Sequence, residues 1–156
     1  MRPDPDSVSA AVKGGGVAGS AGVSPIPVPP PRILVGTDLV AVDRIARLLA
    51  EQPGLAARVF TGRELAYCQS RGRSAPAHLA ARFAAKEAVL KALGTGAAGA
   101  DWTDIEVVNG RDGRPGLRLR GRAASTARRE RTHNAEISLT HTAGLAMAHA
   151  VLLCAG

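Results

Sequence analysis

The stretch Leu79-Ala-Ala-Arg-Phe-Ala-Ala-Lys-Glu-Ala-Val-Leu-Lys-Ala-Leu93 decides the fold, because nearly every residue in it favours a helix. It follows the segment Ser74-Ala-Pro76, and Gly94 stands where a helix usually ends. The sequence therefore predicts one long helix over about 79–93. A core of small residues such as these alanines favours a helix that lies close to a sheet.

Shorter elements are predicted on both sides of this helix. Arg32-Ile-Leu-Val-Gly-Thr-Asp38 is typical of a buried strand, and residues 42–51 place their apolar side chains at helical spacing. The remaining predictions are a weaker helix over 63–71, a hairpin of strands 102–108 and 117–120, a basic helix over 123–131, and closing strands over 136–140 and 145–153. This order predicts an α+β fold, in which a single small domain packs helices on an antiparallel sheet.

Length and composition narrow the class of protein. The 156 residues are enough for one core, and with 46% hydrophobic but only 3% aromatic residues that core is built mainly from Ala, Val, Leu and Ile. A net charge of +7 favours anionic partners such as phosphates, nucleic acid or an acidic protein. Two cysteines, Cys68 and Cys154, are too few for a disulfide framework, so we expect a reducing, cytoplasmic compartment. No apolar run is long enough to cross a membrane, and the N-terminus does not fit a signal peptide, so we expect no membrane association.

The chain is predicted to divide into a disordered tail, residues 1–31, and a folded domain, residues 32–156. Seven of the ten prolines and five glycines fall in the tail, which has no aromatic residue. Such a segment cannot bury enough apolar surface to offset the entropy lost on ordering. It is interpreted as a partner-docking arm, a dispensable extension or the product of a misplaced start codon.

Glu87 and Lys91 are the first candidates for chemistry. They are four residues apart and share a face of the predicted helix, whereas Lys86 points about 100° away. The simplest interpretation is an exposed ion pair. Phe83, one turn earlier on the same face, indicates instead that this face is partly buried, and a buried Glu needs a partner or a metal to stay ionised.

Asp38 is a second candidate carboxylate, placed at the C-terminal end of the predicted strand. It is also explained as an N-cap or turn residue for the helix that begins near Val42. If Asp38 and Glu87 meet, they form a sparse oxygen site of the kind that Mg²⁺ uses, in which water and phosphate complete the coordination. Two carboxylates are too few for a dedicated calcium site.

Two further segments carry polar groups near the ends of elements. The turn Gly94-Thr95-Gly96 could present backbone N–H groups to a phosphate, although it is neither a P-loop nor a dinucleotide fingerprint. His141 could bind phosphate or ribose, assist proton transfer, or be an ordinary turn residue. The lack of a Gly-x-Ser-x-Gly motif argues against a serine hydrolase, and the scarcity of aromatic residues argues against base stacking on nucleic acid.

Three blocks of residues in fixed order carry a resemblance to a known family. They are Ile33-Leu-Val-Gly-Thr-Asp38 with Arg44-Ile45 behind it, Arg82-Phe-Ala-Ala-Lys-Glu-Ala-Val-Leu-Lys-Ala-Leu-Gly-Thr-Gly96, and Ile137-Ser-Leu-Thr-His-Thr142. Over residues 32–153 the chain resembles the holo-acyl-carrier-protein synthases, the small bacterial type of 4′-phosphopantetheinyl transferase. The central block is the most specific of the three.

The resemblance implies a reaction and a set of site residues. Members of this family transfer phosphopantetheine from coenzyme A to a serine of apo acyl carrier protein, use Mg²⁺ and release adenosine 3′,5′-bisphosphate. By position, Asp38 and Glu87 would be Mg²⁺ ligands, and Glu87 would also be the base for the serine, directly or through a metal-bound water. Lys91 would neutralise the pyrophosphate or protonate the leaving phosphate. Lys91 and the following positions would bind coenzyme A: Arg82, Gly94, Thr95, Gly96 and His141.

The resemblance also implies partners. Arg44 and Arg47, on the exposed face of helix 42–51, would face the acidic carrier protein, which belongs to fatty-acid or polyketide synthesis. The assembly would be a homotrimer with active sites between subunits. Arg71 and Arg73 are not demanded by the family motif, and they either contact the 3′-phosphate of the cofactor or are merely solvated.

Other classes of protein explain fewer of these residues. A basic module that binds nucleic acid or other anions without catalysis would account for the net charge but leaves Asp38, Glu87 and Lys91 without a role, so we expect no nucleic-acid partner. A larger, two-lobed transferase would need roughly twice the chain. A catalytically silent homologue would not need all the polar positions that are present.

Overall fold

The computed structural model describes residues 30–96 and 99–156. The predicted tail, residues 1–31, lies outside the described residues apart from Pro30 and Pro31. The elements are β1 (Arg32–Ala41), α1 (Val42–Glu51), α2 (Leu55–Val59), α3 (Gly62–Gln69), η1 (Gly72–Ser74), α4 (Ala75–Ala92), η2 (Trp102–Asp104), β2 (Ile105–Asn109), β3 (Pro115–Leu119), α5 (Gly121–Arg129), β4 (Thr132–Thr142) and β5 (Leu145–Cys154).

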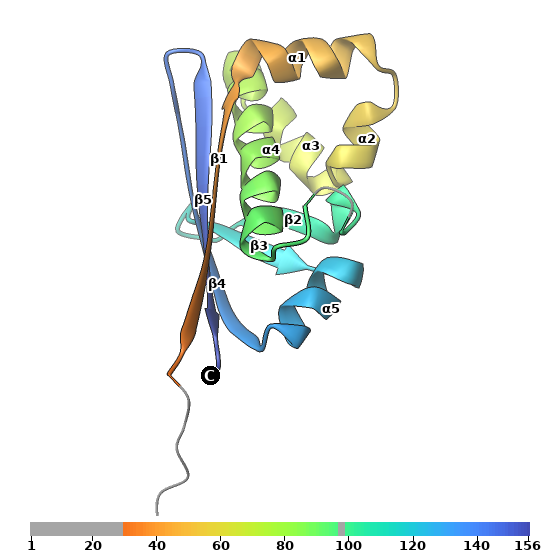
Figure 1. Cartoon of the computed structure of the whole chain (residues 1–156). Coiled ribbons are helices and arrows are strands. Elements are labelled where there is room, and N and C mark those ends of the chain that lie inside the picture. The colour runs from red at the N-terminus through yellow and green to blue at the C-terminus, as the bar shows by residue number, and fades with distance from the viewer. Residues whose placement is uncertain (1–29, 97–98) are drawn as a thin grey trace, which may run out of the picture.

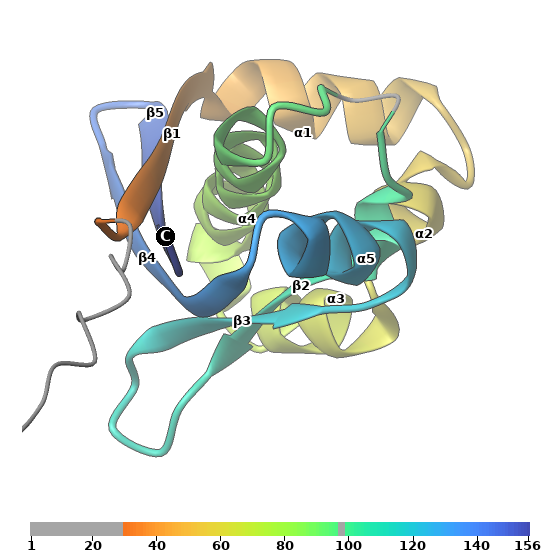
Figure 2. The same ribbon diagram turned by 60° about the horizontal axis from the view of Figure 1, so that its bottom comes forward.

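The strands form two antiparallel sheets, as the predicted α+β class requires. One has the order β1-β5-β4, and the other is the predicted hairpin of β2 and β3. The long helix α4 lies between the three-stranded sheet and the other helices (Figure 1). Seen from below, α4 is at the centre of the molecule, with the sheet on one side and α5 on the other, while the hairpin of β2 and β3 runs past α4 toward β4 (Figure 2).

The core forms where α4 packs on β1, β5 and β4. The inward residues of β5 are mostly alanines, and the buried positions of α4 are mostly alanines too, so the helix and the sheet approach closely. Gly36 on β1 marks the closest approach, since a Cβ atom there would lie 1.9 Å from the carbonyl oxygen of Ala88. The contact requires glycine, and it lies two residues before Asp38.

The other face of the three-stranded sheet carries an apolar patch that none of the described residues covers. Four large hydrophobic side chains are exposed on this face, and β1 and β5 carry them: Ile33, Val35, Leu39 and Leu145. Val35 is 60% exposed and Leu39 57%. An uncovered apolar sheet face of this kind is typical of a surface that contacts another chain.

The structure corrects several predicted boundaries. β1 continues to Ala41, so Asp38 lies inside the strand opposite Ala148 and not at the strand's end. The N-cap of α1 is Ala41, which has no side-chain cap, so the interpretation of Asp38 as an N-cap is wrong. α4 begins at Ala75, and the short α2 was not predicted. Within the described ranges, no helix combines the length and the apolar character needed to cross a membrane.

Candidate active site

Asp38 on β1 meets Lys91 on α4. The Nζ atom of Lys91 donates hydrogen bonds to Asp38 Oδ1 at 2.8 Å and to the carbonyl oxygen of Thr37 at 2.9 Å. The exposed fraction is 50% for the Lys91 side chain and 14% for that of Asp38. The pair therefore lies at the edge of the core, and its cation reaches solvent. The simplest interpretation of the helix spacing was an ion pair between Glu87 and Lys91, but Lys91 bonds to Asp38 instead.

Glu87 lies close enough to this pair to be affected by both charges. Burial and then the negative charge of Asp38 raise the pKa of Glu87, while Lys91 acts in the opposite direction. Asp38 Oδ2 is buried and has no hydrogen-bond partner among the described residues. When both are ionised, two neighbouring carboxylates with one nearby cation leave negative charge uncompensated, which is an unstable arrangement unless another cation joins them.

The residues present fit a magnesium ion. The unpartnered Oδ2 of Asp38 and the carboxylate of Glu87 are hard oxygen donors of the kind that Mg²⁺ prefers, and Mg²⁺ needs only one or two protein carboxylates when a phosphate and water are also available. The described residues contain no group of three or more His, Cys, Asp or Glu side chains that could hold a metal, which argues against a cage made of protein alone. Asp38 and Glu87 are therefore the residues that could hold this ion.

Arg82, one of the predicted cofactor-binding residues, is held by groups that the sequence analysis did not identify. Its side chain donates to Asn109 Oδ1 at 2.6 Å, and its guanidinium carbon lies 4.0 Å from the centre of the Tyr67 ring. The Nε atom is buried and has no partner among the described residues. A pocket of about 310 Å³ opens beside it, lined among others by Arg63, Tyr67, Arg82, Asn109 and Arg118.

His141 on β4 forms an aromatic cluster with His78 and Tyr67. The ring centres of His78 and His141 are 5.3 Å apart and those of Tyr67 and His78 are 5.8 Å apart, both edge to face. Burial, followed by the charges of His141, Arg82 and Arg71, lowers the pKa of His78. Arg71 is exposed, and its guanidinium carbon lies 4.4 Å from the centre of the Tyr67 ring, at the edge of this cluster.

His78 could have been found from the sequence, because it precedes Arg82 by four residues and shares its helix face. Tyr67 and Asn109 carry no such signal. They are brought to Arg82 from α3 and β2, which lie far from it in the sequence.

The loop after α4 differs from its predicted form. The N–H groups of Gly94 and Thr95 donate back to the carbonyl oxygens of Lys91 and Leu90, at 3.1 and 3.2 Å, and so complete the end of the helix. The expectation that these two groups are free to hold a phosphate is wrong. Gly94 has the positive φ of a helix C-terminus, and the buried hydroxyl of Thr95 has no partner among the described residues.

Arg44 and Arg47 are both exposed on α1, as predicted. An apolar pocket of about 190 Å³ lies between α1 and the start of α4 and is lined by Ala46, Leu49, Pro76 and Leu79. At about 100° per residue, Arg44 and Arg47 project from a different side of α1. Two exposed cations on one helix suit a partner that is acidic.

Comparison with known proteins gives concordant results. A model described as the 4′-phosphopantetheinyl transferase superfamily matches residues 34–148. The holo-[acyl-carrier-protein] synthase of Frankia casuarinae is 50% identical over 117 residues, which cover 75% of this chain and 93% of that protein. The corresponding protein of Moorella thermoacetica is 44% identical, with 75% and 91% covered.

Solved structures agree with these matches. The "Chronobacterium ammoniagenes ACPS-CoA complex" superposes with a TM-score of 0.69 at 29% identity, covering 80% of this chain and 98% of that chain. The holo-(acyl-carrier-protein) synthase of Bacillus anthracis in complex with CoA (3′,5′-ADP) gives a TM-score of 0.64 at 30% identity, with 78% and 96% covered. These matches extend over nearly the whole of each solved chain. The family model, which matches residues 34–148, spans Asp38, Glu87, Lys91 and His141.

Proposed function

We propose a specific reaction for this chain, which belongs to the 4′-phosphopantetheinyl transferase superfamily. Its similarity to proteins named holo-[acyl-carrier-protein] synthase identifies it as one of these enzymes. It transfers the 4′-phosphopantetheine group of coenzyme A to a serine of apo acyl carrier protein, depends on Mg²⁺ and releases adenosine 3′,5′-bisphosphate. The observation that carries the proposal is the arrangement of Asp38, Glu87 and Lys91, in which Asp38 Oδ2 is buried with no partner among residues 30–96 and 99–156.

The transfer exchanges one phosphorus–oxygen bond for another. The serine oxygen bonds to the phosphorus that carries the pantetheine, and the bond from that phosphorus to the departing adenosine 3′,5′-bisphosphate breaks. Bound by Asp38 and Glu87, Mg²⁺ would supply positive charge to the pyrophosphate of coenzyme A. Glu87 accepts the proton of the serine hydroxyl, a role for which its raised pKa suits it. Lys91, whose ammonium reaches solvent, neutralises the leaving phosphate or gives it a proton.

Coenzyme A is proposed to lie across α4, with its charged groups on the cationic side chains. Arg82 offers its Nε atom, which has no partner among the described residues. His141 lies with His78 and Arg71 in one cluster of cations and imidazoles suited to a phosphate. Gly94, Thr95 and Gly96 contribute through the Thr95 hydroxyl and the close approach that glycine allows, since the N–H groups of Gly94 and Thr95 are already bonded.

The carrier protein is proposed to dock on α1, on the exposed face that carries Arg44 and Arg47. Electrostatic attraction between this surface and an acidic carrier would set the rate of association. Arg44→Glu is therefore expected to raise the KM for the carrier and to flatten its dependence on salt, while the KM for coenzyme A stays unchanged. Equal effects on both substrates would place the carrier elsewhere.

A homotrimer is proposed as the working assembly. It is supported by the exposed apolar face of β1 and β5, which a neighbouring subunit would cover. The cytoplasm is the proposed compartment, because Cys68 and Cys154 are both free and buried, as suits a reducing environment.

The test is the intact mass of an apo acyl carrier protein after incubation with this protein, coenzyme A and Mg²⁺. A gain of one phosphopantetheine group that disappears in EDTA, with adenosine 3′,5′-bisphosphate found as the second product, is the expected result. An unchanged carrier mass, with a folded protein that binds coenzyme A and with several carriers tried, would refute the proposed transfer.

A further inference from the structure

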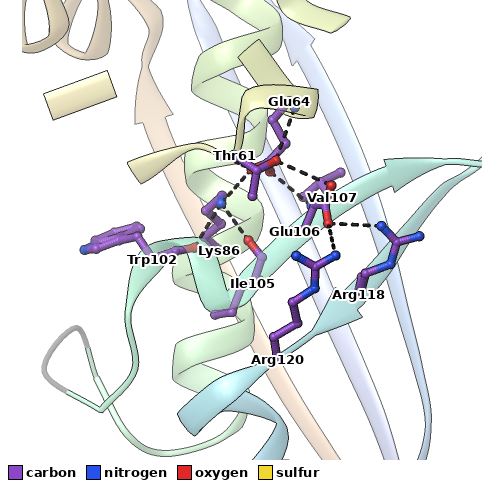
Figure 3. Close-up of polar contacts among 9 residues, drawn as sticks. All are labelled: Thr61, Glu64, Lys86, Trp102, Ile105, Glu106, Val107, Arg118 and Arg120. Atoms are coloured by element: carbon purple, nitrogen blue, oxygen red, sulfur yellow. Dashed lines mark hydrogen bonds and ion pairs between the residues drawn. The ribbon is translucent and has the colours of Figure 1, made fainter. Parts of the chain in front are cut away.

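Lys86, next to Glu87 in α4, is a buried charge that the proposed reaction does not use. Its side chain is fully buried, and its ammonium donates three hydrogen bonds: to Glu64 Oε2 at 2.8 Å, to the carbonyl oxygen of Trp102 at 3.0 Å and to that of Ile105 at 2.6 Å (Figure 3). A lysine ammonium has three protons to donate, so every one of them is used.

The partner of Lys86 is itself completely bonded. Glu64 Oε2 also accepts from the N–H of Thr61 at 2.9 Å, and Glu64 Oε1 accepts from the N–H of Val107 at 3.0 Å. These contacts join four elements at one point, because Glu64 belongs to α3, Trp102 to η2, Val107 to β2 and Lys86 to α4. We refer to Lys86, Glu64 and the backbone groups that they bind as the Lys86 anchor.

A second carboxylate, Glu106, supports the anchor from the hairpin. It is 1% exposed and accepts from Arg118 at 3.1 Å, with Arg120 at 3.5 Å. The hydroxyl of Thr61 donates to it at 3.5 Å, so Thr61 connects the two carboxylates (Figure 3). The anchor thus lies in a network in which each buried charge faces an opposite charge.

The composition of α4 explains why such an anchor is needed. Eight of its eighteen residues are alanines, and its buried positions occur all round the helix and not on one stripe. Helices normally fix their rotation by fitting ridges of large side chains into grooves, and alanines offer only shallow ridges. A buried polar pair resists both rotation and sliding, because displacement would strand two charges away from water.

We propose that Lys86 is a positioning residue for the transfer: its anchor fixes the rotation of α4 and so holds Glu87 and Lys91 against Asp38. Glu87 follows Lys86 directly and projects about 100° away around the helix, so any rotation that moves one side chain moves the other. This inference rests on the proposed function, since it assigns Lys86 a role in the same site.

The direct test uses Lys86→Met, which keeps most of the side-chain volume and removes the charge. The measured quantity is the ratio of two dissociation constants for coenzyme A, the Kd in EDTA over the Kd in Mg²⁺, both obtained by calorimetry. This ratio isolates the metal-dependent part of binding. Loss of a group that orients metal ligands typically weakens metal affinity about 10–100-fold. We expect this ratio to fall about tenfold or more, kcat to fall with it, and the KM for the carrier to stay unchanged.

Val89→Ala is the matched control for stability. Val89 is fully buried in the same helix, so its truncation leaves a cavity and lowers the midpoint of thermal unfolding, but the Lys86 anchor stays intact. The ratio for Val89→Ala is expected to equal that of the wild type. The double variant Glu64→Gln/Lys86→Met avoids a stranded carboxylate, so it is expected to unfold at a higher temperature than Lys86→Met while the ratio stays low.

Two outcomes would overturn the proposal: a wild-type ratio and kcat in the double variant, or a fall of the same size in Val89→Ala. Trp102, the only tryptophan, reports the state of the anchor by its fluorescence, because its ring stacks on Phe83 and its carbonyl binds Lys86. Failure of the proposed function would give a result that differs from these two outcomes. A wild-type protein whose coenzyme A affinity ignores Mg²⁺ would refute the metal assignment, and kcat of the same variants would then decide on Lys86.

Discussion

Two adjacent residues of α4, Lys86 and Glu87, sit in opposite electrostatic conditions. Lys86 is fully buried and every proton of its ammonium has an acceptor. Glu87 is half-buried beside Asp38, whose Oδ2 atom has no partner in the part of the chain that the structure describes. The difference shows where the fold tolerates unfavourable charge. It compensates completely the charge that holds the helix in place, and it leaves incomplete the charges that a metal and a phosphate would complete.

The contrast also separates stability from activity. Removing one partner from a fully paired, buried site strands the other and costs stability. Removing a carboxylate from an under-compensated site relieves repulsion and costs only the function. Each of the following variants tests one side of this distinction.

The largest expected effect is the loss of transfer in Glu87→Ala or Asp38→Ala. Both carboxylates are proposed to bind the metal, and Glu87 also to accept the serine proton, so either truncation should reduce phosphopantetheine transfer below detection by intact mass. The circular dichroism spectrum should stay that of the wild type. Wild-type transfer by Glu87→Ala would remove the basis of the metal assignment.

Lys91→Ala is expected to lower kcat by about 10²–10⁴-fold, the range for loss of a group that moves a proton in the transition state. Since Lys91 lowers the pKa of Glu87 against burial and Asp38, its removal should raise that pKa further. The acid limb of the kcat profile should therefore move to higher pH.

Arginine should not replace Lys91. A planar guanidinium cannot reproduce the contacts of one nitrogen with both Asp38 and the carbonyl of Thr37. Arg128→Ala, which removes a cation from α5, is the control for net charge. An unmoved acid limb in Lys91→Ala would show that Lys91 does not act on Glu87.

Gly36→Ala tests the spacing between β1 and α4, on which the meeting of Asp38 and Glu87 depends. The new methyl group would lie 1.9 Å from the backbone oxygen of Ala88, which cannot rotate away as a side chain can. We expect a loss of about 3 kcal/mol in the free energy of unfolding, measured with urea. Gly116→Ala, whose methyl group would meet Val108 at 3.6 Å, should be nearly neutral, and equal losses in both would contradict the close approach at Gly36.

The smallest expected effect is a stabilisation by Glu87→Gln. It is also the most direct test of the difference between the fully paired Lys86 and the under-compensated Glu87. A folded-state pKa above the unfolded one means that the contribution of Glu87 to stability is full below its ordinary pKa and is lost as pH rises through the raised value. In EDTA at neutral pH, Glu87→Gln should therefore unfold at a slightly higher temperature than the wild type, and at pH 4 the difference should shrink. The exposed Glu51→Gln is the control, and a lower midpoint for Glu87→Gln would contradict the predicted sign.

Much of this fold follows from local sequence. The helix over 79–93, the strands on either side and the hairpin were predicted, because helix formers, β-branched runs and turn pairs act over a few residues. The same blocks pointed to Asp38, Glu87 and Lys91, and the structure brings them together.

The features that were missed depend on distant segments. β1 extends beyond Asp38 because β5 pairs with it along its whole length, and nothing near Asp38 signals that pairing. Lys86 is hidden for a related reason, since alanines on every side of α4 give no apolar stripe from which a buried face could be read. Its partner Glu64 lies on another helix.

The pairing of β1 with β5 also bears on how the protein is made. Asp38 faces Ala148 across the sheet, so the strand that carries this carboxylate has no neighbour until the ribosome has synthesised nearly all the residues described here. Helices α1 to α4 can begin to form during translation, but the three-stranded sheet cannot, since the middle strand comes last in the chain. The nascent chain therefore cannot form the site around Asp38 before β5 is made. Until then the apolar side chains of β1 remain accessible to chaperones.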